Sequence, residues 1–133
     1  GNAPGLSKGA AEWLVSKKVA LVGVDAANID HPLATSLAAH RGGPLMRRLP
    51  KAYADETGRD PKKDFPDWNV AHKILLRAGI PTIENVGGDV ASVTGKRVTL
   101  QAYPWKYFGG DGCNIRLMAI LDPGGNYRIA KGA

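Results

Sequence analysis

Apolar residues near the start of the chain first recur with helical spacing and then run continuously. One face of a helix over residues 8–17 is formed by Ala10, Ala11, Leu14 and Val15. Ser7 directly precedes this segment and is a preferred N-cap residue, because its hydroxyl can accept a backbone N–H bond. The apolar run over residues 19–25 ends in a carboxylate, which is typical of a strand covered on both faces. We expect residues 25–30, at the carboxyl edge of that strand, to form the rim of a site.

The second half of the chain predicts another helix and more strands. Residues 68–78 have helical spacing, Asp67 is placed to cap the start, and Gly79 followed by Pro81 is placed to end it. A turn or short helical piece is expected over residues 89–93. Strands are expected over residues 80–86, 97–104 and 115–121. Helices alternating with strands favour the α/β fold class.

Between residues 31 and 66 the pattern has no clear period. Glycine and proline gather there, and a short helix is expected only over residues 45–56. A loop this long inside a compact domain is unusual and generally serves function or assembly. We interpret residues 31–66 as an irregular arm, for an active site or an oligomer contact, within a single domain over residues 1–133.

Composition narrows the class of protein. The 133 residues are 44% hydrophobic and 23% charged, which excludes a collagen, a coiled coil and a disordered tail. No apolar run is long enough for a transmembrane helix, and residues 1–5 lack the layout of a signal peptide. Cys113 is the single cysteine, so nothing indicates an oxidising compartment. We therefore expect a soluble, cytoplasmic protein with no membrane partner.

The charge balance is basic. Lys and Arg number 18 against 12 Asp and Glu, a formal net charge of +6, which favours anionic partners only if the charge gathers on one face. The densest basic stretch, residues 41–63, also contains acidic residues, and Tyr53 is its one aromatic residue. Nucleic-acid binding is therefore not the expected function.

His72 and Glu84 are the leading candidates for chemistry. From His72 the predicted helix rises about 9 Å to its end, and the next strand returns about 13 Å to Glu84, so both side chains lie toward one end. His72 lies about 130° from the centre of the apolar helix face, which argues against a simple core histidine. Imidazole and carboxylate suit zinc or manganese, but two ligands are too few, and a surface histidine remains the alternative.

Other candidates have simpler structural interpretations. We expect the glycine-rich segment of residues 109–112 to be a tight turn whose Asp111 bonds its own backbone. Cys113 is expected to be a buried or inert thiol, and His31 and His40 to be surface residues. Packing, rather than a substrate cage, is the expected role of four aromatic residues: Trp68, Trp105, Tyr107 and Phe108.

Several short motifs follow one another at specific spacing. They are Pro4-Gly5-Leu6-Ser7 with Ala10-Ala11-Glu12-Trp13-Leu14, Val22-Gly23-Val24-Asp25 with Ile29-Asp30, His72-Lys73-Ile74-Leu75-Leu76, Gly79-Ile80-Pro81-Thr82-Ile83-Glu84-Asn85, and Gly109-Gly110-Asp111-Gly112. Taken together the chain resembles the C-terminal half of the metal-dependent cyclase family, which includes kynurenine formamidase and isatin hydrolase. The resemblance implies a swivelling β/β/α-type domain, with His72 and Glu84 as ligands of a divalent metal, zinc or manganese.

The same resemblance implies that part of the site is missing from these residues. The family's His-x-Gly-Thr-His-x-Asp motif and a further catalytic histidine have no counterpart here. We therefore expect an incomplete fold and a site completed by a second polypeptide in an oligomer, acting on a small amide. Asp25, Asp30 and Asp111 are weaker candidates, for positioning the rim or the turn of the site. No residue of this chain is assigned a catalytic role. Cys113-Asn114 stands where a Ser-Pro pair is common, which bears on substrate choice. The alternative is a noncatalytic scaffold or interaction subunit that retains the fold.

Overall fold

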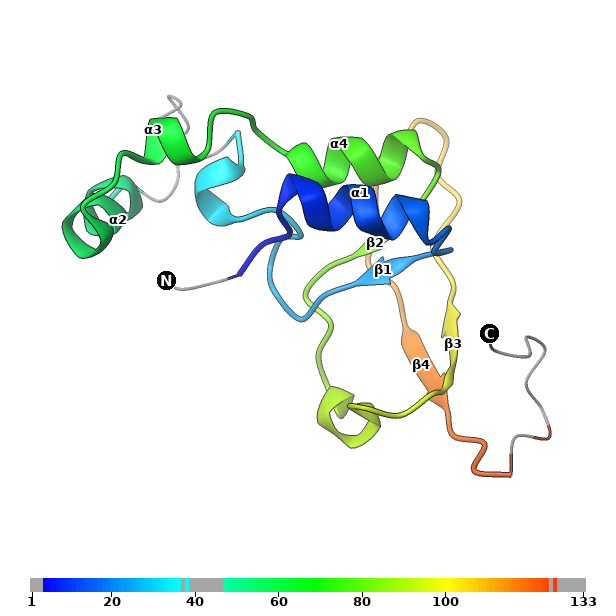
Figure 1. Cartoon of the computed structure of the whole chain (residues 1–133). Coiled ribbons are helices and arrows are strands. Elements are labelled where there is room, and N and C mark those ends of the chain that lie inside the picture. The colour runs from blue at the N-terminus through cyan, green and yellow to red at the C-terminus, as the bar shows by residue number, and fades with distance from the viewer. Residues whose placement is uncertain (1–3, 37, 39–46, 125, 127–133) are drawn as a thin grey trace. The chain divides into compact units, whose positions relative to one another are not determined.

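The structure is a computed structural model that describes residues 4–36, 38, 47–124 and 126 (Figure 1). It divides into two compact units, Gly1–Val86 and Gly87–Ala133. The described part contains small, open sheets and several helices, which is compatible with the predicted α/β class. No helix among the described residues combines the length and the apolar character needed to cross a membrane.

Unit 1 is built on a β-α-β arrangement. Strand β1 (Val22–Gly23) pairs in parallel with strand β2 (Thr82–Ile83), and Val22 lies opposite Thr82. Hydrogen bonds continue beyond the strand ends, from the N–H of Asn85 to the carbonyl of Ala26 at 2.8 Å. The strands are shorter than predicted, and Gly23 is exposed, so the expected cover of β1 on both faces is not found within this unit.

Two helices pack together beside this sheet (Figure 1). Helix α1 (Lys8–Ser16) begins as predicted, because the Ser7 hydroxyl accepts the N–H of Ala10 at 3.2 Å. Helix α4 (Val70–Arg77) ends before Gly79, whose φ of 73° suits glycine. The contact is lined by small, fully buried alanines, which allow the helices to approach closely. The buried core cluster consists of Ala11, Ile29, Ala71, Leu75 and Ile80.

The predicted start of α4 is wrong. The helix begins at Val70 rather than Trp68, and its N-cap position is Asn69, which has left-handed backbone angles and makes no side-chain cap bond. Asp67 is therefore not the N-cap residue. The first-turn N–H groups of this helix are instead satisfied by Asp30, which lies 41 residues before Ala71.

The predicted irregular arm contains three short helical pieces among its described residues. They are η1 (Pro32–Ala34), α2 (Leu49–Thr57) and α3 (Pro61–Asp64). The helix expected over residues 45–56 therefore begins at Leu49 and ends one residue later than expected. Asp64 ties α2 to α3, since its carboxylate accepts the Tyr53 hydroxyl at 2.6 Å and pairs with Arg59 at 2.9 Å. The bond to Asp64 raises the pKa of the Tyr53 phenol.

The expectation that His31 is a surface residue is wrong, because its ring is half-buried. The ring stacks on Phe65 with centroids 4.5 Å apart, and its Nδ1 accepts the N–H of Leu33 at 3.1 Å. Burial lowers the pKa of His31. His40 lies outside the described residues.

Unit 2 contains η3 (Val90–Val93), as expected, and an antiparallel pair of strands, β3 (Thr99–Ala102) and β4 (Leu117–Ile120). The connection between these strands covers residues 103–116, so the tight turn expected at residues 109–112 is part of a wider loop. Asp111 is exposed in it, and Cys113 is half-buried, with its sulfur accepting the N–H of Trp105 at 3.2 Å.

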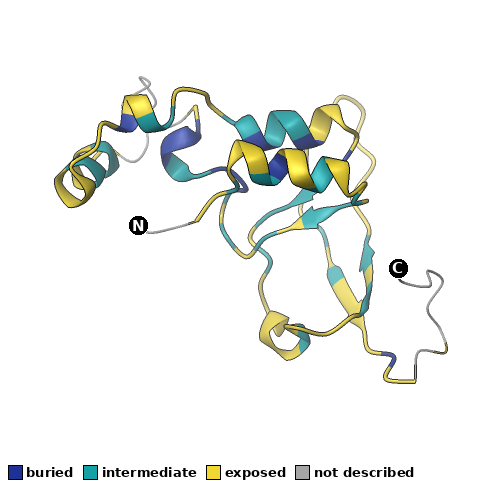
Figure 2. Cartoon of the chain, in the orientation of Figure 1, coloured by how far each residue is buried: buried dark blue, intermediate teal, exposed yellow. Residues whose placement is uncertain are grey.

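The aromatic residues expected to pack are exposed, although the rings of Trp105 and Tyr107 stack with their centroids 6.4 Å apart. Trp105, Tyr107 and Phe108 all lie exposed in the loop between β3 and β4 (Figure 2). Trp68, in unit 1, is 44% exposed, and the ammonium of Lys73 lies 3.7 Å from its ring centroid. Amino-acid type alone suggested burial, but an aromatic ring in a loop is buried only if another element covers it.

Candidate functional site

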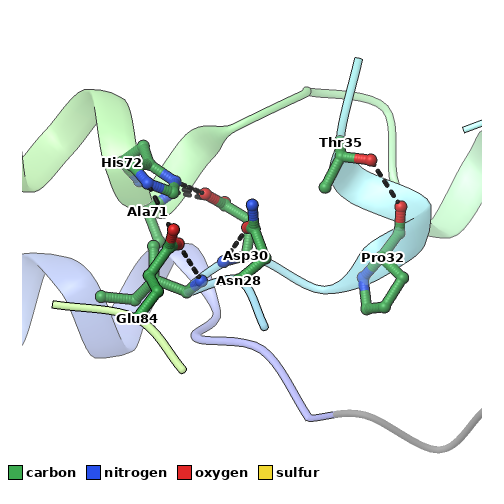
Figure 3. A network of polar contacts seen from close by, with 8 residues as sticks. Asn28, Asp30, Pro32, Thr35, Ala71, His72 and Glu84 are labelled. Carbon is green, nitrogen blue, oxygen red and sulfur yellow. Dashed lines mark hydrogen bonds and ion pairs between the residues drawn. The ribbon is translucent and has the colours of Figure 1, made fainter. Parts of the chain in front are cut away.

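The side chains of His72 and Glu84 lie next to each other in the structure (Figure 3). His72 comes from the first turn of α4, and Glu84 follows the end of β2. The Nε2 atom of His72 is 3.2 Å from Oε1 of Glu84. The helix-and-return geometry therefore places the two side chains at one end, as the sequence predicts. Their exposed side-chain fractions are 21% and 29%, so the pair is half-buried and open to an approaching group.

Asp30 contacts the other side of the same imidazole. Its Oδ2 lies 2.7 Å from Nδ1 of His72, and its side chain is fully buried. The predicted rim over residues 25–30 thus contributes the side chain of Asp30 to the cluster. Asp25 is exposed on the same segment, and Asp111 lies in unit 2.

Backbone contacts that the sequence did not reveal hold this cluster. The N–H of Ile29 donates to Oε1 of Glu84 at 2.6 Å, and the N–H of Asp30 donates to Oδ1 of Asn28 at 2.8 Å. The second contact has a local signal, because Asn commonly bonds the backbone two residues on. The first joins residues 55 positions apart, and no local pattern predicts it.

The donor set around His72 has a specific chemical consequence. An ionised carboxylate only accepts hydrogen bonds, so the contact with Asp30 requires a proton on Nδ1 of His72. In the neutral ring, Nε2 then carries a lone pair and faces a second acceptor, Oε1 of Glu84. A proton or a cation between these two atoms satisfies both of them.

A divalent metal fits this pair. Zinc bonds of about 2.0–2.2 Å in tetrahedral geometry put neighbouring ligand atoms roughly 3.3–3.6 Å apart, close to the spacing of Nε2 and Oε1. A histidine ligand whose other ring N–H donates to a carboxylate is the usual arrangement at metal centres. Among the described residues, however, no group of three or more His, Cys, Asp or Glu side chains could hold a metal ion. His72 and Glu84 alone are fewer ligands than a zinc site requires.

The chain is thus a protein of mixed helices and strands in which the half-buried His72 lies between the carboxylates of Asp30 and Glu84. Residues 2–31 match a protein-family model described as "Putative cyclase", and the match covers 30 of the 133 residues. The matched segment includes Asp30 but neither His72 nor Glu84. Searches of curated proteins and of solved structures find no match.

Proposed function

We propose that this chain forms one part of a metal-dependent hydrolase that acts on a small amide, a formamide or a cyclic amide. In this proposal His72 and Glu84 bind a divalent metal, zinc or manganese. The remaining ligands come from outside these residues, on a partner polypeptide. The match of residues 2–31 to the putative cyclase model supports an enzymatic role. The observation that carries the proposal is the pair of acceptor atoms on His72 and Glu84, 3.2 Å apart and half-buried.

The residues of this chain prepare the site for a cation. Asp30 orients the imidazole through Nδ1, and the N–H of Ile29 holds Oε1 of Glu84. Both side chains are thereby directed to one point without the conformational cost of ordering them on binding. A divalent ion bound there would lower the pKa of its water and polarise an amide carbonyl.

The half-burial of the pair also matters for chemistry. A site that excludes part of the solvent strengthens the attraction between a cation and the Glu84 carboxylate, because the effective dielectric constant is lower than in water. The exposed fractions of 21% and 29% leave both side chains accessible to solvent. Proton transfer to the leaving nitrogen is assigned to a histidine from outside these residues.

Replacement of the proposed ligands tests the function. In the native assembly, His72→Ala should abolish metal retention, measured by elemental analysis, and turnover of formamide and cyclic-amide substrates. Glu84→Gln should lower both, since a neutral amide is a weaker ligand than a carboxylate. Arg77→Ala, an exposed position at the end of α4, is the matched control and should leave both unchanged. Full metal content and full activity in His72→Ala would refute the assignment.

The proposed partner has its own test. The denaturing intact mass of every polypeptide in the purified native particle should include a chain or segment that carries the His-x-Gly-Thr-His-x-Asp motif. A stable particle containing only this 133-residue sequence would contradict a shared metal site.

A further inference from the structure

Asp30 is a fully buried carboxylate that receives three hydrogen bonds from two consecutive residues (Figure 3). Its Oδ1 accepts the N–H of Ala71 at 2.7 Å. Its Oδ2 accepts the N–H of His72 at 3.1 Å and lies 2.7 Å from Nδ1 of the same residue. A buried carboxylate needs such donors to offset its lost hydration. All three donors lie in the first turn of α4, so the Asp30 carboxylate binds the start of this helix.

Asp30 acts as the N-terminal cap of α4, although it lies far from this helix in the sequence. Asn69 occupies the N-cap position of α4 but makes no side-chain cap bond. The exposed N–H groups of a first helical turn must find acceptors, and negative charge is favoured there by the helix dipole. The same oxygen, Oδ2, binds both the backbone and the ring of His72. The position of the helix start and the orientation of the imidazole are therefore set by one group.

We infer that Asp30 is a positioning residue: it keeps the proton of His72 on Nδ1 and directs Nε2 toward Glu84. The orientation of the His72 ring does not depend on the proposed function. Only the expected effect on metal binding rests on it. A metal ligand must present an unprotonated nitrogen, and loss of such an outer carboxylate typically lowers metal affinity 10–100-fold.

The loop that carries Asp30 is held on both sides. The N–H of Leu6 donates to the carbonyl of Ile29 at 2.8 Å, and Asn28 accepts the N–H of Asp30. Ile29 donates in turn to Oε1 of Glu84. One short loop thus contacts both proposed ligands, through a side chain to His72 and through the backbone to Glu84. Any change that moves this loop should disturb the pair together.

The test is the protonation state of the His72 ring nitrogens, read by nitrogen-15 NMR on the metal-free native assembly. The wild-type ring should carry a hydrogen-bonded proton on Nδ1. In Asp30→Asn, one amide oxygen cannot accept all three bonds, and the amide NH₂ favours an unprotonated Nδ1 with the proton on Nε2. Asp60→Asn is the matched control, because Asp60 also caps a helix, accepting the N–H of Lys62 at 2.9 Å, and no hydrogen bond or ion pair joins it to a histidine among the described residues. It should leave the His72 signal unchanged.

A Zn²⁺ titration of the metal-stripped native assembly, carrying the wild-type, Asp30→Asn or Asp60→Asn sequence, gives the second readout, and Asp30→Asn should bind 10–100-fold more weakly than wild type. An unprotonated Nδ1 in the wild-type chain would overturn the inference, and this result needs no variant to fold. A ring signal in folded Asp30→Asn identical to wild type would also overturn it. If Asp30 controls the ring proton but the wild-type chain and its native assembly bind no Zn²⁺ or Mn²⁺ through His72, the positioning role stands and the proposed function fails.

Discussion

Gly5 occupies a position where any side chain would collide with the loop that carries Asp30. A Cβ placed on Gly5 would overlap the backbone of Asp30 and His31, and no flexible side chain stands between them to move aside. Gly5→Ala must therefore displace either the segment before α1 or residues 30–31. Gly9→Ala, four residues later in α1, meets nothing within 4 Å and is the matched control.

The size of the effect follows from these contacts. Overpacking against a rigid neighbour costs about 1–3 kcal/mol, and loss of the Leu6 to Ile29 hydrogen bond adds about 0.5–1.5 kcal/mol. A destabilisation of about 2 kcal/mol lowers the midpoint of thermal unfolding by roughly 8–16 °C in a unit of this size. Gly9→Ala should instead stabilise the chain by up to about 1 kcal/mol, since alanine is the better helix former.

Urea unfolding followed by circular dichroism measures both variants, and the His72 ring signal reports whether the loop has moved. Gly5→Ala should lose stability and weaken the bond between Asp30 and Nδ1 of His72. Equal stability of Gly5→Ala and Gly9→Ala, with an unchanged His72 signal, would refute the close approach that this reasoning assumes.

Two further predictions concern the core and the arm. Leu75→Ala removes a fully buried side chain from the contact between α1 and α4 and should cost about 2–5 kcal/mol; Leu76→Ala, at a 55% exposed neighbour, should cost far less, and similar urea midpoints for the two variants would contradict the packing. Burial lowers the pKa of His31 below 6.5, so the stability due to its neutral ring is complete above about pH 6.5 and is lost as the pH falls through the lowered value. The difference in unfolding free energy between wild type and His31→Gln should shrink over that range, and a difference independent of pH would exclude this contribution.

Local signals in the sequence predicted local structure well. Ser7 caps α1 because its hydroxyl reaches an N–H three residues away, and Gly79 ends α4 because it adopts a positive φ. The start of α4 was mispredicted for the opposite reason. Asp67 has the residue type and the position of a helix cap. The acceptor that the helix uses is instead Asp30, and a contact between residues so far apart cannot be predicted from local sequence spacing.

The candidate site shows the same division. The proximity of His72 and Glu84 follows from the rise of a helix and a strand, so it could be predicted from spacing. The contact of Asp30 with His72, and of Ile29 with Glu84, depends on how β1 and β2 pair and could not. The arm also depends on tertiary contacts, since His31 is half-buried only because Phe65 stacks on it.

The segment matched by the cyclase family model ends at residue 31, whereas the proposed ligands lie 41 and 53 residues further on. The two are nevertheless parts of one structural unit. Within the matched segment, Gly5 allows the close approach of the chain to residues 30–31, and Leu6 binds the carbonyl of Ile29. Ile29 and Asp30 then supply the contacts that hold Glu84 and His72. The matched residues thus hold the pair formed by His72 and Glu84 in place. A substitution at Gly5 should therefore change the environment of His72, although the two residues lie 67 positions apart.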